Sequence, residues 1–354
     1  MSATRPIERF VHDDEHRMLL DTIHGLSQER PVRAGDAGGG ADERIDAARA
    51  ELVRLGLWSL SLAEEQGGGG ADAATVALAT AAIGAAWPAL GVALAHAHAA
   101  GAALAGDSAG RSVLAGVAAQ GRGIAVVDLA GDSATSHDDG TIEVMRVDAA
   151  APAPDLVVLV DDGTVALVPA DRVEFGAPLA RTGLDGAGSV PATTSLDRAA
   201  ARFGADVRLV RRTLYQGLTA VAAGIAETAA HDAMAYAGER VQFGGPLTAL
   251  PAVRDSLHTL LAGASDALTA AFAHPRDTTA AAALLDRTLE AAVDVASGAV
   301  QAHGGYGFLA EYPAEGRLRD AISLRAVADI GAVRERAAQA AAGPDDPGAV
   351  SRSA

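Results

Sequence analysis

Four stretches of helical periodicity follow one another in the last two fifths of the chain. The first runs from Leu214 to Ile225, where apolar residues recur every three or four positions and so share one face of a helix. Two further stripes cover residues 253–264 and 285–300, and a fourth helix is expected after Pro313, running to about residue 333. Because the connections are short, the pattern predicts an antiparallel four-helix bundle, which we place at residues 201–340.

The first part of the chain, residues 1–119, also has helical sequence. The segment from Ala74 to Gly106 is apolar on almost every side, which is typical of helices buried in a bundle. The phrase LGLWSLSLAEEQGGGG, from Leu55 to Gly70, interrupts the helical pattern with a glycine-rich loop. We therefore expect an N-terminal helical domain.

Between residues 120 and 200 the helical pattern gives way to short β-branched runs separated by Gly, Asp and Pro. GIAVVDL, TIEVMRV, DLVVLV, TVALVPA and RVEFG each have the length of a strand. The predicted fold is α+β and mostly α: an N-terminal helical domain, a small middle β domain and a C-terminal four-helix bundle. Residues 341–354 are rich in Pro, Gly and Ser and are expected to form a disordered tail.

Composition excludes several classes of function. A formal net charge of −17 argues against nucleic acid or an anionic membrane surface as a main partner. Cysteine is absent, so disulfides and thiolate metal sites are excluded. His96 and His98 are two positions apart on a predicted helix and face different ways, so we expect no metal site. The N-terminus has no signal-peptide pattern, and the cytoplasm is the expected compartment.

Three separated phrases resemble the acyl-CoA dehydrogenase family. They are LGLWSLSLAEEQGGGG, AYAGERVQFGGPL from Ala235 to Leu247, and QAHGGYGFLAEYPAEGRLRDA from Gln301 to Ala321. They occur in the family's order, over about 300 residues, and each lies where a matching element is expected. The resemblance implies a fold of two helical domains around a β domain, FAD as cofactor, and removal of the α and β hydrogens of an acyl-CoA thioester.

In this family a Glu takes the α proton, and the resemblance identifies two positions for it. One lies seven residues after the RDA phrase, where this chain has Ala328. The other lies on an earlier helix, where counting back from the QFG phrase gives Leu214. Neither side chain can accept a proton. Asp329 is the nearest replacement, although a solvent-facing or capping carboxylate is the more ordinary interpretation of it.

The resemblance also assigns contacts with the adenosine diphosphate part of FAD. In family oligomers the matching residues contact a FAD held chiefly by the neighbouring subunit; here they are Arg240, Phe243, Gln301, Gly304 and Gly305. A guanidinium suits a pyrophosphate, and glycine lets backbone N–H groups approach a ligand closely. By contrast, DLAGDSATS only weakly resembles the family's TEP.AGSD phrase, and no Trp follows residue 87. The walls around the flavin ring and the substrate are therefore expected to be lost.

Contacts to a neighbour's FAD without a catalytic base predict an auxiliary subunit of a heteromeric acyl-CoA dehydrogenase. Its expected partners are a homologous catalytic subunit that holds most of the acyl-CoA, and an electron-transfer flavoprotein or a similar acceptor. The pattern resembles that of actinobacterial enzymes acting on steroid side chains. Two alternatives stay open: a complete homomeric enzyme with a displaced base, and a flavin-free scaffold protein. His303, Tyr306 and Phe308 are expected to be structural or packing residues.

Overall fold

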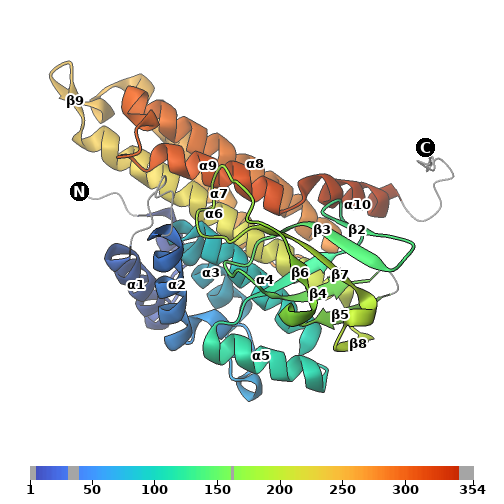
Figure 1. Ribbon diagram of the computed structural model, residues 1–354. Coiled ribbons are helices and arrows are strands. Elements are labelled where there is room, and N and C mark those ends of the chain that lie inside the picture. Colours follow the sequence, from blue (N-terminus) through green and yellow to red (C-terminus); the bar gives the residue numbers. More distant parts are fainter. Residues whose placement is uncertain (1–4, 31–39, 161–162, 343–354) are drawn as a thin grey trace.

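A computed structural model describes residues 5–30, 40–160 and 163–342 of the chain (Figure 1). Within the described residues, helices precede and follow a β domain in the sequence, and the β domain packs beside them. The predicted fold class, mostly helical with a small middle β domain, is confirmed. Among the described residues no helix is long and apolar enough to cross a membrane.

The N-terminal helices begin where the sequence offers a cap. Asp13, Asp72 and Asp107 each precede a helix and accept a hydrogen bond from a backbone N–H of its first turn. The apolar segment is two helices, because Pro88 starts a new one after Trp87. The helices of this part are α1 (Asp14–Glu29), α2 (Gly40–Arg54), α3 (Ala73–Ala86), α4 (Pro88–Leu104) and α5 (Ser108–Gln120).

The β domain consists of two sheets packed face to face. One has the order β1-β4-β5-β8, with β1 and β4 parallel, and the other has the order β2-β3-β7-β6. Along β4, Leu156 and Val158 face the second sheet, whereas Val157 and Leu159 join the core shared with the helices, which explains the continuous apolar run. The strands are β1 (Ile124–Asp128), β2 (Ala134–Ser136), β3 (Thr141–Val147), β4 (Asp155–Leu159), β5 (Thr164–Val168), β6 (Glu174–Phe175), β7 (Val190–Ser195) and β8 (Ala201–Gly204).

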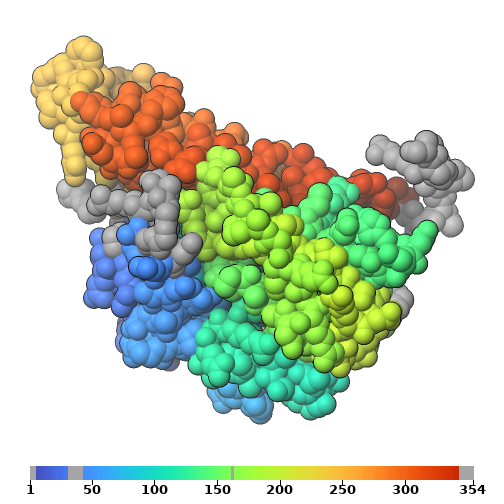
Figure 2. Space-filling model, viewed as in Figure 1, coloured from blue at the N-terminus to red at the C-terminus, as the bar shows by residue number. Residues whose placement is uncertain are grey.

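The long helix α6 (Val207–Glu239) is the axis of the molecule and packs against α3, α4, α7 and α8. Small residues allow this close approach: a Cβ at Gly224 would lie 2.1 Å from the carbonyl oxygen of Ala81. After α6 the chain forms a hairpin of β9 (Val241–Gln242) and β10 (Gly245–Pro246), which projects from one end of the molecule (Figure 2). The remaining helices are α7 (Pro251–Ala271), α8 (Thr278–His303), α9 (Ala314–Val327) and α10 (Ile330–Ala342).

The expected fourth helix of the bundle is divided in two. We predicted one helix from Pro313 to about residue 333, but α9 ends at Val327 and α10 begins at Ile330. Asp329 lies in the link with a φ of +49°, outside the helical region. The prediction of an uninterrupted helix was therefore wrong. The direction of the Asp329 side chain is set by the backbone of this link and not by a helix. The predicted tail falls largely on residues 343–354, which lie outside the described residues.

Candidate functional site

The two positions that the family resemblance gives for the catalytic base are both at least partly buried. Ala328 follows the last turn of α9 and is 5% exposed, and Leu214 is half-buried on α6. Neither carries an ionisable group. The contacts of the nearby carboxylates Asp329 and Asp128 therefore decide whether either could replace the base.

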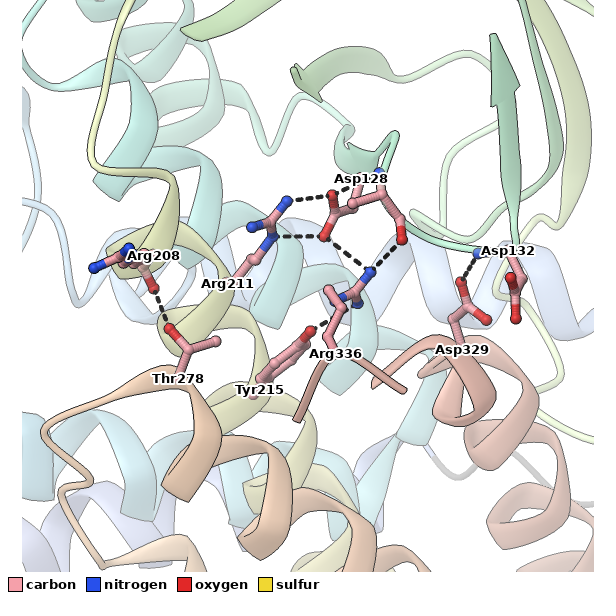
Figure 3. A network of polar contacts seen from close by, with 9 residues as sticks. Asp128, Asp132, Arg208, Arg211, Tyr215, Thr278, Asp329 and Arg336 are labelled. Carbon is pink, nitrogen blue, oxygen red and sulfur yellow. Dashed lines mark hydrogen bonds and ion pairs between the residues drawn. The ribbon is translucent and has the colours of Figure 1, made fainter. Parts of the chain in front are cut away.

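The Asp329 carboxylate is held by the segment between β1 and β2. Its Oδ2 accepts hydrogen bonds from the backbone N–H groups of Asp132, at 2.9 Å, and Ser133, at 3.1 Å. Figure 3 shows the side chain directed toward this segment. Asp329 therefore acts as a capping carboxylate. Its hydrogen bonds join the β domain to the C-terminal helices.

Asp128, at the end of β1, takes part in a second network between the β domain and the helices (Figure 3). Arg211 on α6 donates two hydrogen bonds to its carboxylate, each 2.8 Å long. Arg336 on α10 lies 3.6 Å from the same carboxylate and donates to the Ala130 carbonyl oxygen, at 2.7 Å, and to the Tyr215 hydroxyl, at 2.8 Å. Burial raises the pKa of Tyr215. Asp329 and Asp128 are therefore both engaged in contacts within this chain.

Sequence reasoning did not find this network. Asp128 stood in the weakly matching DLAGDSATS phrase, and Arg336 lies after the last motif. The available signal was a single acidic residue ending an otherwise apolar strand, since a charge in such a place generally needs a partner.

A cavity of about 310 Å³ lies where the β domain meets the end of α9. His96 of α4 forms part of its wall, and the Nδ1 atom of His96 accepts a hydrogen bond from the Val126 N–H, at 3.1 Å. Burial lowers the pKa of His96, and that of His98, to about 4, so both rings are neutral at pH 7. Within the described ranges no group of three metal-binding side chains occurs.

The residues matched to FAD contacts gather at the opposite end of α6. Arg240 directly follows this helix, and Phe243 is 90% exposed at the tip of the β9–β10 hairpin. Gln301 lies exposed in the last turn of α8, and Gly304 and Gly305 follow on the surface. A side chain at Gly304 would be strained, because its φ is +59° and its ψ is −136°.

Three residues next to these FAD-contact positions were expected to be structural or packing residues, and the structure agrees only in part. His303 is buried and its Nδ1 lies 2.7 Å from the Ala299 carbonyl oxygen, so it is a structural group as predicted. Tyr306 and Phe308 lie on η7 (Gly304–Phe308) and were expected to pack. Phe308 is instead 76% exposed, whereas Tyr306 is 40% exposed and keeps a ring contact with Tyr312. This end of the molecule therefore presents aromatic side chains to its surroundings.

The length of α6 separates these contacts from the network at Asp128. From Tyr215 to Arg240 the helix extends roughly 35–40 Å, at about 1.5 Å per residue. A single bound cofactor molecule cannot reach both regions of one chain. The two regions are therefore separate surfaces of this chain.

Models of the two helical parts of a known family match this chain. The acyl-CoA dehydrogenase N-terminal domain matches residues 13–111, and the acyl-CoA dehydrogenase C-terminal domain matches residues 208–332. The chain belongs to the acyl-CoA dehydrogenase family. The two matched ranges flank the β domain.

Similar proteins support this membership, one through a short sequence alignment and two through solved structures of low sequence identity. An acyl-CoA dehydrogenase of Bacillus subtilis (strain 168) is 39% identical over 112 residues, which are 30% of this chain and 30% of that protein. The alignment thus spans less than a third of that relative's length. Two solved structures show the same fold at low identity.

The first of them is butyryl-CoA dehydrogenase from Megasphaera elsdenii, with a TM-score of 0.68 and 20% identity. The second is a variant of the Tcur3481-Tcur3483 steroid ACAD, with a TM-score of 0.71 and 21% identity. Each match covers 93% of this chain and 99% of the other.

Proposed function

We propose that this chain is an auxiliary subunit of a heteromeric, FAD-dependent acyl-CoA dehydrogenase. A homologous catalytic subunit supplies the Glu that takes the α proton and holds most of the acyl-CoA. This chain contributes Arg240, Phe243, Gln301, Gly304 and Gly305 to a FAD held chiefly by that partner. An electron-transfer flavoprotein or a similar acceptor reoxidises the assembly.

The observation that carries the proposal is that neither family position for the base carries a proton acceptor. Ala328 and Leu214 occupy the two family positions. Asp329 accepts two backbone hydrogen bonds, and Asp128 is paired with Arg211. A general base must reach the proton that it removes, and these carboxylates are directed toward groups of their own chain. These contacts argue against the complete homomeric enzyme.

The exposed end of α6 fits the phosphate part of FAD. Within the described part of the chain, the Arg240 guanidinium has no carboxylate partner, including Asp232 and Glu239, with which a surface ion pair was considered. Its planar set of donors matches phosphate oxygens. Nothing lies within 4 Å of a Cβ placed on Gly304 or Gly305, so a ligand can approach their backbone. When bound, FAD supplies the acceptor for the β hydrogen as hydride.

A steroid side-chain CoA thioester is the substrate class that we propose. The support is the likeness to the steroid ACAD at the level of the fold, together with the family signature without a base. A pocket shared between unlike subunits offers more room for a polycyclic acyl group than one subunit alone.

Co-expression with a neighbouring gene of the same family tests the proposal. We expect a yellow complex that reduces its flavin with an acyl-CoA, whereas this chain alone stays inactive. Arg240→Ala should lower the flavin content of the complex, with Arg287→Ala, an exposed arginine of α8, as the matched control. A complex without flavin absorbance would instead support the scaffold protein, and a yellow, active homomer would refute the auxiliary role.

A further inference from the structure

Three of the four tyrosines of this chain gather beside Arg240, although aromatic residues make up only 3% of the sequence. Tyr236 comes from α6, Tyr306 from η7, and Tyr312 from the loop before α9. The buried ring of His303 completes the cluster. So many rings at one surface need an explanation beyond filling the core.

The contacts in this cluster run from the interior to the surface. His303 stacks on Tyr236, with 4.3 Å between the ring centroids. Tyr312 meets both rings edge-on, at 5.8 Å and 5.9 Å. Tyr306 is the outermost ring and lies 5.5 Å from Tyr312. The three distances that involve Tyr312 lie in the range of favourable aromatic pairs, so Tyr306 is supported from the inside.

Tyr306 presents its ring to the guanidinium of Arg240. The Cζ atom of Arg240 lies 5.1 Å from the ring centroid, within the range of a cation–π contact. The Arg240 backbone is fixed as well, because its N–H donates to the Tyr236 carbonyl oxygen and its own carbonyl oxygen accepts from Leu247. Over the described ranges the Arg240 side chain makes no hydrogen bond or ion pair, so its N–H donors remain available.

We infer that Tyr306 is a positioning residue: its ring holds the Arg240 guanidinium in the orientation that binds a phosphate of the partner's FAD. This inference rests on the proposed function and extends it. A flexible arginine loses side-chain freedom when it binds a ligand, and an arginine already held over a ring loses less. Because the contact uses the ring face, the tyrosine hydroxyl should be dispensable.

Flavin dissociation from the co-purified complex provides the test, measured as fluorescence of FAD released on dilution. We expect Tyr306→Phe to match the wild type and Tyr306→Leu to weaken FAD retention about 3-fold to 10-fold. In an Arg240→Ala background, Tyr306→Leu should have no further effect, because the ring acts through the arginine. Size-exclusion chromatography checks that each complex assembles.

Three results would overturn the inference while leaving the auxiliary role intact: wild-type retention in Tyr306→Leu, a Tyr306→Leu effect that persists fully without Arg240, or loss of the complex itself in Tyr306→Leu. Wild-type retention in Arg240→Ala is a different failure. It would refute the proposed contact between Arg240 and FAD, and the proposed role of Tyr306 would then fail as well.

Discussion

Asp329 has a structural role beside Ala328, one of the two positions that the family resemblance gives for the base. Its φ of +49° lies in the left-handed region, where Asn and Asp are tolerated better than other side chains. From this position its carboxylate reaches the Asp132 and Ser133 N–H groups. These two hydrogen bonds direct its Oδ2 atom toward the backbone of the β domain.

Two substitutions at Asp329 separate these roles. We expect Asp329→Asn to keep both hydrogen bonds, the backbone conformation and the full activity of the complex. Asp329→Ala leaves two N–H groups without their acceptor and strains the link, so the free energy of unfolding should fall by about 1–3 kcal/mol. Urea denaturation measures the difference, with Asp138→Ala at an exposed site as the control. Loss of turnover in Asp329→Asn would instead support the alternative in which Asp329 is the displaced base.

Asp320, in the RDA phrase, is expected to make stability depend on pH. Burial raises its pKa to about 6, although its Oδ1 accepts a hydrogen bond from the Leu184 N–H, at 2.7 Å. The folded chain therefore retains a proton that the unfolded chain releases near pH 4, so this group destabilises the fold progressively as pH rises from about 4 to 6.

Asp320→Asn should remove this dependence while keeping an acceptor for Leu184. Relative to the variant, the wild type should lose up to about 3 kcal/mol of unfolding free energy between pH 4 and pH 7. Chemical denaturation at several pH values measures the difference between the two proteins. A difference that stays constant with pH would show that Asp320 titrates normally.

At the scale of elements, the β9–β10 hairpin contains strain at its exposed tip. Phe243 and Gly244 have φ values of +54° and +84°, as in a type I′ turn, where Asn-Gly is preferred. Phe243→Asn should raise the stability of the isolated chain by about 1 kcal/mol and lower flavin retention in the complex. Thermal unfolding and flavin content measure the two effects. Unchanged flavin retention would indicate that the strained aromatic side chain has no role in the assembly.

Helix α10 joins the C-terminal helices to the β domain through Arg336. Arg336→Ala should lower the unfolding free energy by about 2–3 kcal/mol and speed amide exchange in residues 128–133, because Asp128, Ala130 and Tyr215 lose a shared donor. Arg334→Ala on the same helix is the control, since its ion pairs with Asp286 and Glu290 lie at the surface and contribute little to stability. Equal effects of the two variants would contradict this role of Arg336.

Helices and apolar strands could be predicted because their periodicity is local. Polar strands such as VPATTS, which forms β7, were not predicted because their pairing with β3 depends on distant residues. The break at Asp329 was missed for the same reason: the sequence keeps its helical pattern, and contacts with residues 132 and 133 lie far away in the chain. Of the candidate site, the residues at the two family base positions could be identified by counting from the motifs, whereas the network around Asp128 required the fold.

At the scale of the whole molecule, the two ends of α6 have different roles. One end is closed by ion pairs between the β domain and helices α6 and α10, and the other presents Arg240 and exposed aromatic rings. Exposed aromatic residues beside a free guanidinium are typical of surfaces that bind a partner or ligand. Under the proposed function, this exposed end completes a site on another subunit.

The most direct test of this account is acyl-CoA-dependent flavin reduction by this chain alone, supplied with FAD, compared with its complex with the catalytic homologue. We expect bleaching of the flavin absorbance only in the complex, and its loss when the partner's Glu is replaced by Gln. Flavin reduction by the chain alone, at a rate similar to that of the complex, would contradict the account.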